Sequence, residues 1–134
     1  MSNNIRLELT IFGDAFDLNE LTSLITIKPT KTYLKGEVVK GYNKTIKRKE
    51  MSWSYSIPPL DTLYFEEYAN KLLDKFESKA ASLKGFLLKN NLKMKLFVVL
   101  EISGDQTPAL YLNNRFLNFI NDLEGEIDVD IYAI

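Results

Sequence analysis

The sequence predicts an α+β domain of the ferredoxin-like type, a two-layer sandwich in which a four-stranded antiparallel sheet carries helices on one face. Segments with a two-residue apolar period alternate with segments of helical period, in the order β-α-β-(α-α)-β-α-β. The motif Leu-x-Ile-x-Gly-Asp occurs at 9–14 and again at 100–105, each time between a strand and a capped helix. We therefore expect two β-α-β halves with a helical insertion between them, in one domain over residues 1–134.

The first half begins with a strand at 5–12, IRLELTIF, whose apolar residues alternate along its length. A short helix follows, with Asp17 as its N-cap and Glu20 three residues later, which is a capping-box pattern. Pro29 prevents that segment from continuing as a helix. The next strand is MSWSYSI at 51–57, in which serines alternate with larger apolar residues.

The second half starts with a helix at 61–78, for which Asp61 is the expected N-cap, and a further helical piece at 79–89. The strand LKMKLFVVLEIS at 92–103 alternates without a break. Thr107 and Pro108 predict the N-cap and first residue of a helix that runs to Leu123. The segment EIDVDIYAI at 126–134 is the last expected strand.

One core is expected where the helices cover the apolar face of the sheet, and the first and third strands should lie side by side in opposite directions. The residues expected on that face are Leu9, Ile11, Leu96, Val98, Leu100, Ile127, Val129 and Ile131. Trp53 is expected in the core rather than in a ligand cage. On the outer face Phe97 is the aromatic residue that the alternation predicts for the central strands, so ion pairing is favoured there over stacking on RNA bases.

The residue types that the chain lacks restrict its chemistry. Cysteine and histidine are both absent, which excludes a disulfide framework, thiolate chemistry and the commonest metal ligand. Asp128 and Asp130 would offer two carboxylates to Mg²⁺ or Ca²⁺, but no third acid at metal-loop spacing accompanies them, and strand acids usually face water. We therefore predict no metal site, no cofactor and no catalytic residue.

The location of the protein is predicted from patterns that the sequence does not contain. No apolar run reaches the ~18 residues of a membrane span. The N-terminus MSNNIRLELT lacks the basic and apolar regions of a signal peptide. A cytoplasmic protein without membrane contact is expected, and the sequence makes no prediction of its oligomeric state.

Several short motifs together resemble one protein family. These are FGD at 12–14, LTSLITIKPT at 21–30, Lys35-Gly36, the isolated Trp53, and IDVDIY at 127–132. Their order and spacing are similar to those of the bacterial domain-of-unknown-function family 4279, over nearly the whole chain. The resemblance implies a small cytoplasmic bacterial protein of one domain. It implies no reaction, cofactor or catalytic residue, so no site is carried over from it.

The strongest charge bias lies between Lys28 and Lys49, which contain eight basic residues and one acid, a charge of +7. The rest of the chain has nine basic and seventeen acidic residues, a charge of −8. A ribbon bent at Gly36–Gly41 would gather these cations on one surface. The predicted partner-binding residues are Lys31, Lys35, Lys44, Lys47, Arg48 and Lys49.

This basic segment leads to the predicted function, a non-enzymatic module that binds another protein, for instance an immunity protein that neutralises a toxin, or an adaptor. The partner is expected to be acidic because opposite charges steer association. The alternatives are a nucleic-acid-binding module that uses residues 28–49, a solvated loop without a partner, and a small enzyme of unknown reaction. Tyr, Lys, Asp and Glu side chains suffice for acid–base chemistry, but no catalytic motif combines them here.

Overall fold

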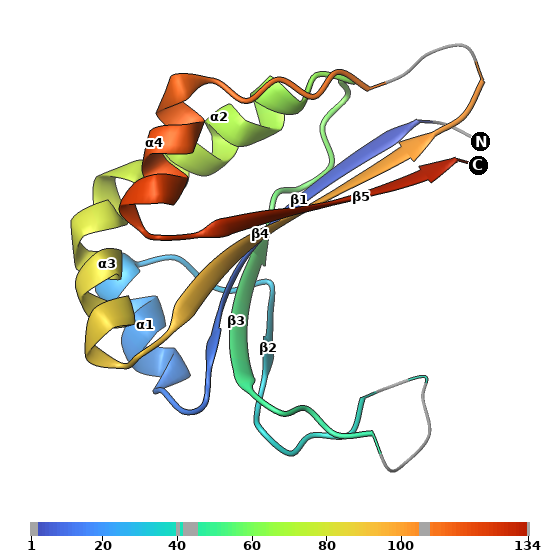
Figure 1. Ribbon diagram of the computed structural model, residues 1–134. Helices are drawn as coiled ribbons and strands as arrows, with labels where there is room; N and C mark the ends of the chain where they lie inside the picture. Colours follow the sequence, from blue (N-terminus) through green and yellow to red (C-terminus); the bar gives the residue numbers. More distant parts are fainter. Residues whose placement is uncertain (1–2, 40, 42–45, 105–107, 134) are drawn as a thin grey trace.

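In the computed structural model, one five-stranded sheet carries a layer of helices on one side (Figure 1). The structure describes residues 3–39, 41, 46–104 and 108–133. The strands are β1 (Asn4–Gly13), β2 (Lys31–Tyr33), β3 (Met51–Ser56), β4 (Lys93–Ile102) and β5 (Glu126–Ala133). The helices are α1 (Leu18–Ile25), α2 (Phe65–Phe76), α3 (Ala80–Lys89) and α4 (Asn114–Asp122), with a short 3₁₀ helix η1 (Glu77–Lys79) between α2 and α3. No helix in the described ranges is long and apolar enough to cross a membrane.

The sheet has the order β2-β3-β1-β4-β5, and it is mixed. Three of its pairings are antiparallel, whereas β4 and β5 run parallel. The predicted four-stranded antiparallel sheet of the ferredoxin-like type is therefore wrong. The predicted antiparallel contact between the first long strand and LKMKLFVVLEIS is correct, because these segments are the neighbours β1 and β4.

Two features of the chain account for this difference. Both edges of β1 are occupied, by β3 and β4, so the last strand joins the sheet at the free edge of β4. The connection from 103 to 125 contains α4 and is long enough for a parallel crossover. The additional strand β2 has only three residues, which are too few for alternation to reveal, and it forms by pairing with the second edge of β3.

The core lies between the helices and the alternating apolar face of the sheet. Trp53 is fully buried on this face, where its indole ring meets Phe76 of α2 edge to face at 6.3 Å between ring centroids. Its Nε1 donates a hydrogen bond of 3.0 Å to the hydroxyl of Thr22 in α1. The prediction that Trp53 belongs to the core is therefore consistent with the structure.

The predicted core list is right for the central strands and wrong at one edge. Leu9, Leu96 and Val98 are fully buried, and Leu100 is 3 % exposed. Ile131 is instead 60 % exposed. The reason is its position, because β5 is an edge strand and the adjacent Tyr132 and Ala133 are exposed as well.

Local sequence signals predict the first residue of α1 correctly but not those of α2 and α4. Asp17 caps α1 as predicted, since its Oδ1 accepts hydrogen bonds from two backbone N–H groups of the first turn, at 2.9 and 3.1 Å. The predicted start of α2 at Asp61 is wrong, because the helix begins at Phe65. The helix predicted from Pro108 begins only at Asn114. Residues 63–65 pair with Ala109 through backbone hydrogen bonds, which keeps both segments extended. Thr107 lies outside the described residues.

Candidate binding site on the open face of the sheet

The second face of the sheet, here termed the open face, is not covered by any helix of the described chain (Figure 1). Register places three aromatic residues of β1, β2 and β4 and several charges on it. Across the centre of the sheet run Lys31, Ser54, Thr10 and Lys95, in that order. The next row contains Tyr33, Ser52, Phe12 and Lys93. Phe97 follows on β4, two residues beyond Lys95. Aromatic and cationic side chains therefore gather on one end of this face.

The basic arm, residues 34–50, joins β2 to β3 and extends beyond the end of the sheet (Figure 1). Its two sides pair with each other. Gly36 N donates to the carbonyl of Arg48 at 2.8 Å, and Arg48 N donates to the carbonyl of Glu37 at 2.7 Å. A further bond of 2.9 Å joins Val39 N to the carbonyl of Ile46. The described part of the arm is thus a two-sided ribbon, and Gly36 lies within one of its paired sides rather than at a bend between them.

The structure divides the predicted partner-binding residues into two groups. Lys31 forms an ion pair of 3.3 Å with Glu8 of β1, and Lys35 forms one with Asp14, which follows β1. Lys31 lies in β2, before the arm, and Lys35 lies in the arm, and both ion pairs are at the surface. Lys47 and Lys49 are exposed and make no ion pair with a described residue. Lys44 lies outside the described residues.

Arg48 has a different environment from the lysines of the arm. The carbon of its guanidinium group lies 3.6 Å from the centre of the Tyr33 ring, so the group rests on the face of that ring. Its buried Nε makes no hydrogen bond to a described residue. No carboxylate of the described chain forms an ion pair with it either. Arg48 is therefore a cation stacked on a ring, without an anionic partner among the described residues.

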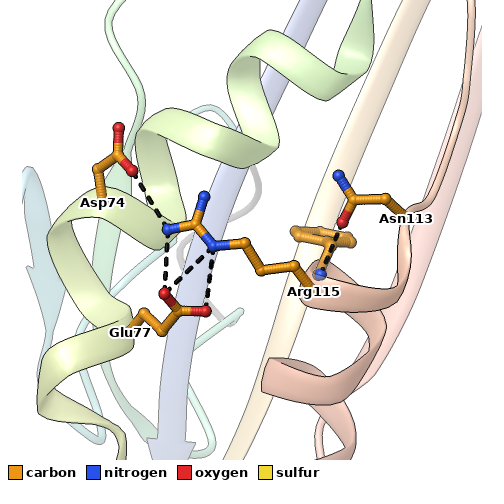
Figure 2. Close-up of polar contacts among 5 residues, drawn as sticks. Asp74, Glu77, Asn113 and Arg115 are labelled. Atoms are coloured by element: carbon orange, nitrogen blue, oxygen red, sulfur yellow. Dashed lines mark hydrogen bonds and ion pairs between the residues drawn. The ribbon is translucent and has the colours of Figure 1, made fainter.

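The contrast with Arg115 shows how this chain treats a structural arginine (Figure 2). The Nε of Arg115 donates to both carboxylate oxygens of Glu77 at 3.2 and 3.1 Å, and an Nη donates to Asp74 at 3.2 Å. These hydrogen bonds, first from Glu77 and then from Asp74, raise the pKa of the Arg115 guanidinium above its ordinary value. Arg115 thus joins the start of α4 to the end of α2, and its charge is balanced by two carboxylates.

A pocket of about 320 Å³ opens on the open face beside the arm. Three segments line it, namely β1, the chain from the end of the arm into β3, and β4. The lining residues are Thr10, Phe12, Arg48, Lys49, Glu50, Met51, Ser52, Lys95 and Phe97. Aromatic side chains, hydroxyl groups and three cations therefore meet at one concave place, and a single acid accompanies them. Such a lining suits a ligand with an apolar part and a negative charge.

The hydroxyl groups at the centre of the open face are satisfied within the protein. Thr10 donates to Glu8 Oε1 at 3.0 Å, so the 2.9 Å contact between Thr10 and Ser54 is a hydrogen bond that Ser54 donates. Glu8 also accepts from Ser56 at 3.0 Å and pairs with Lys31. The charge of Glu8 is therefore taken up locally, and it does not cancel the cations of the pocket.

Sequence reasoning did not place two aromatic residues of this site on the open face. Phe12 continues the alternation of Glu8 and Thr10, which would have placed it on the open face. Tyr33 lies in a segment without apolar periodicity, and only its pairing with Ser52 of β3 shows that it belongs to the open face. The two carboxylates on β5, Asp128 and Asp130, face the same side, and the described residues contain no cluster of three acids that could hold a metal ion.

Fold and site together define a small α+β domain in which a mixed sheet has one helix-covered face and one open face bordered by a basic arm. The chain belongs to the family described as domain of unknown function DUF4279, whose family model matches residues 3–134. This match confirms the resemblance seen in the sequence motifs. Searches of curated proteins and of solved structures gave no match.

Proposed function

We propose that this domain is a non-enzymatic binding module that holds an acidic segment of another protein between the basic arm and the open-face pocket. One observation carries the proposal. Arg48 and Lys49 line the pocket, Lys47 precedes them in the arm, and none of the three forms an ion pair with a described carboxylate. A module of this kind would serve as an adaptor, or as an immunity protein that blocks a toxin.

The charge distribution supports association with an acidic partner. The segment from Lys28 to Lys49 carries +7 and the rest of the chain −8, so the protein has a strong electrical polarity although its net charge is −1. Such a field accelerates encounter with a partner of opposite charge by roughly 10- to 1,000-fold at low ionic strength. Exposed charges are screened beyond about 8 Å at physiological ionic strength, so the association should be sensitive to salt.

A single-stranded nucleic acid is the second candidate, and one observation favours it. Phe12 and Phe97 lie on the neighbouring central strands β1 and β4, which is where base-stacking residues would be needed. The rest of the open face opposes it, because Glu101, Asp128 and Asp130 lie along the other side and would repel a phosphate backbone. Apart from Arg6, which pairs with Glu101, the described cations of the face lie toward one end, which suits a short acidic segment better than a long strand.

The proposal is tested with a double charge reversal, Lys47→Glu with Lys49→Glu. The probe is a fluorescein-labelled, glutamate-rich peptide that contains phenylalanine, and its binding is followed by fluorescence anisotropy and stopped-flow mixing. We expect association to slow by at least about tenfold at low salt, the lower end of typical electrostatic steering. The difference should shrink as salt is added.

The matched control is Lys71→Glu with Lys89→Glu, which changes the net charge equally. Both lysines are exposed on the helical side, and the one ion pair lost, between Lys89 and Glu20 at 3.8 Å, is a weak surface pair. Binding by this control should stay close to that of the unmodified protein. Equal binding by all three proteins would overturn the proposal. Tighter binding of oligothymidylate than of the peptide, with a linear fall of log affinity against log salt, would replace it with the nucleic-acid function.

A further inference from the structure

From the stacking of Arg48 on Tyr33 we infer that Arg48 is the anchor for a carboxylate of the partner, and that the open-face pocket receives an aromatic side chain next to that carboxylate. This inference rests on the proposed function and names the ligand of the same site. It predicts a recognition element in which a Glu or Asp residue adjoins a Phe, Tyr or Trp residue.

The first step is that Arg48 is already ordered before a ligand binds. Its backbone N–H and carbonyl are both engaged across the arm, with Glu37 and Gly36, at 2.7 and 2.8 Å. Its guanidinium group lies 3.6 Å from the centre of the Tyr33 ring, which fixes the plane of the group. A planar guanidinium held in this way binds a carboxylate with little further loss of conformational entropy.

The second step is that Arg48 differs from both other arginines of the chain. Arg6 pairs with Glu101 at 3.8 Å, and Arg115 is bound by Asp74 and Glu77. Arg48 instead lies on the ring of Tyr33. Its buried Nε has no hydrogen-bond partner among the described residues, and its guanidinium group forms no ion pair with any of them. Although the Nε is buried, Arg48 as a whole is partly exposed, so its guanidinium group can receive an incoming carboxylate through paired hydrogen bonds.

The open-face pocket, which Arg48 helps to line, lies between two aromatic rings. Phe12 lies two residues along β1 from Thr10 on one side, and Phe97 lies opposite Glu8, two residues from Thr10 on the other side. The two rings therefore border the floor at Thr10 from positions about 7 Å away along the strand. A volume of about 320 Å³ is large enough for one aromatic side chain, which would meet both rings at their edges or faces.

A carboxylate fits this site better than a phosphate group does. Glu50 lines the pocket. This carboxylate opposes a dianion more strongly than a single negative charge. The aromatic side chain and the carboxylate would therefore come from neighbouring residues of one peptide segment.

The test compares two glutamate-rich peptides of equal charge, one with a central phenylalanine and one with alanine in its place. The unmodified protein should prefer the phenylalanine peptide by roughly tenfold, and Phe12→Ala should abolish that preference. Arg48→Lys keeps the charge but loses the planar fork, so we expect both peptides to bind roughly tenfold more weakly. Tyr33→Leu should weaken both peptides in the same direction, because it removes the ring that orients Arg48.

The control is Arg6→Lys, which alters an arginine of the same open face that already has a carboxylate partner, and its affinity should change by less than about twofold. Circular dichroism melts of every variant confirm that the fold is intact. If Lys47→Glu with Lys49→Glu weakens binding but Arg48→Lys does not, the inference is overturned while the proposed function stands. Stronger competition by inorganic phosphate than by glutarate would also overturn it, because the anchored group would then be a phosphate.

Discussion

Leu100 and Ile131 allow a direct test of how the helices cover the sheet. They are cross-strand partners in the parallel pairing of β4 and β5, and both belong to the alternating apolar set. Leu100 is nevertheless 3 % exposed, and Ile131 is 60 % exposed. We expect Leu100→Ala to destabilise the protein several times more than Ile131→Ala does.

The expected loss in free energy of unfolding follows from the burial of each side chain. Replacing leucine by alanine removes three carbon atoms, and at about 0.8 kcal/mol for each buried group this amounts to roughly 2.4 kcal/mol. The cavity left between the sheet and the helices raises the cost to about 3–4 kcal/mol. At Ile131 most of the side chain is already in water, so its truncation should cost less than about 1 kcal/mol.

Urea denaturation measures both costs, with the fluorescence of Trp53 as the signal. This is the only tryptophan of the chain and it is fully buried, so unfolding transfers it to water. With a slope of about 1–3 kcal/mol per M, a loss of 3 kcal/mol lowers the midpoint by at least about 1 M. Equal midpoints for the two variants would refute the reasoning and show that Ile131 is covered in solution.

Two further changes test contacts of α1. Thr22→Val deprives the indole N–H of Trp53 of its acceptor, which should cost about 1–2 kcal/mol, whereas Thr22→Ser keeps the hydroxyl group and should cost less; equal losses in urea denaturation would contradict this hydrogen bond. Asp17→Ala removes the acceptor of two backbone N–H groups and should lower the free energy of unfolding by about 1 kcal/mol. Ser23→Ala, at an exposed position of the same helix, is its control, and a similar loss there would contradict the capping role.

The position of most strands could be predicted from the sequence, but of their pairings only that of β1 with β4 was predicted correctly. Alternation identifies 5–12, 51–57, 92–103 and 126–134 because each segment has a buried and a less buried face, and the strands in the structure match these ranges to within a few residues. The period of a strand says nothing about which edge it joins. The place of β5 beside β4 follows from the occupation of both edges of β1, which is a property of the assembled sheet.

The candidate site could be predicted only as a concentration of charge. Counting cations selects Lys31, Lys35 and Arg48 alike, because the residues that distinguish them are distant in the sequence. Glu8 and Asp14 pair with the two lysines only after β1 has taken its place beside β3. The contact of Arg48 with Tyr33 likewise requires the arm to fold back on itself.

The separation of the arm's cations into paired and unpaired groups has a physical consequence for binding. Backbone hydrogen bonds, together with the weaker surface ion pairs of Lys31 and Lys35, favour one arrangement of the described part of the arm before a partner binds. Side-chain entropy that is lost when the arm folds is not lost again when the partner binds, so it does not weaken the association. The cations of the arm that form no ion pair with a described residue, Lys47, Arg48 and Lys49, would then meet the proposed partner from this ribbon. A uniformly solvated loop would have to order on binding, and this arm would bind an acidic segment more tightly than such a loop of equal charge.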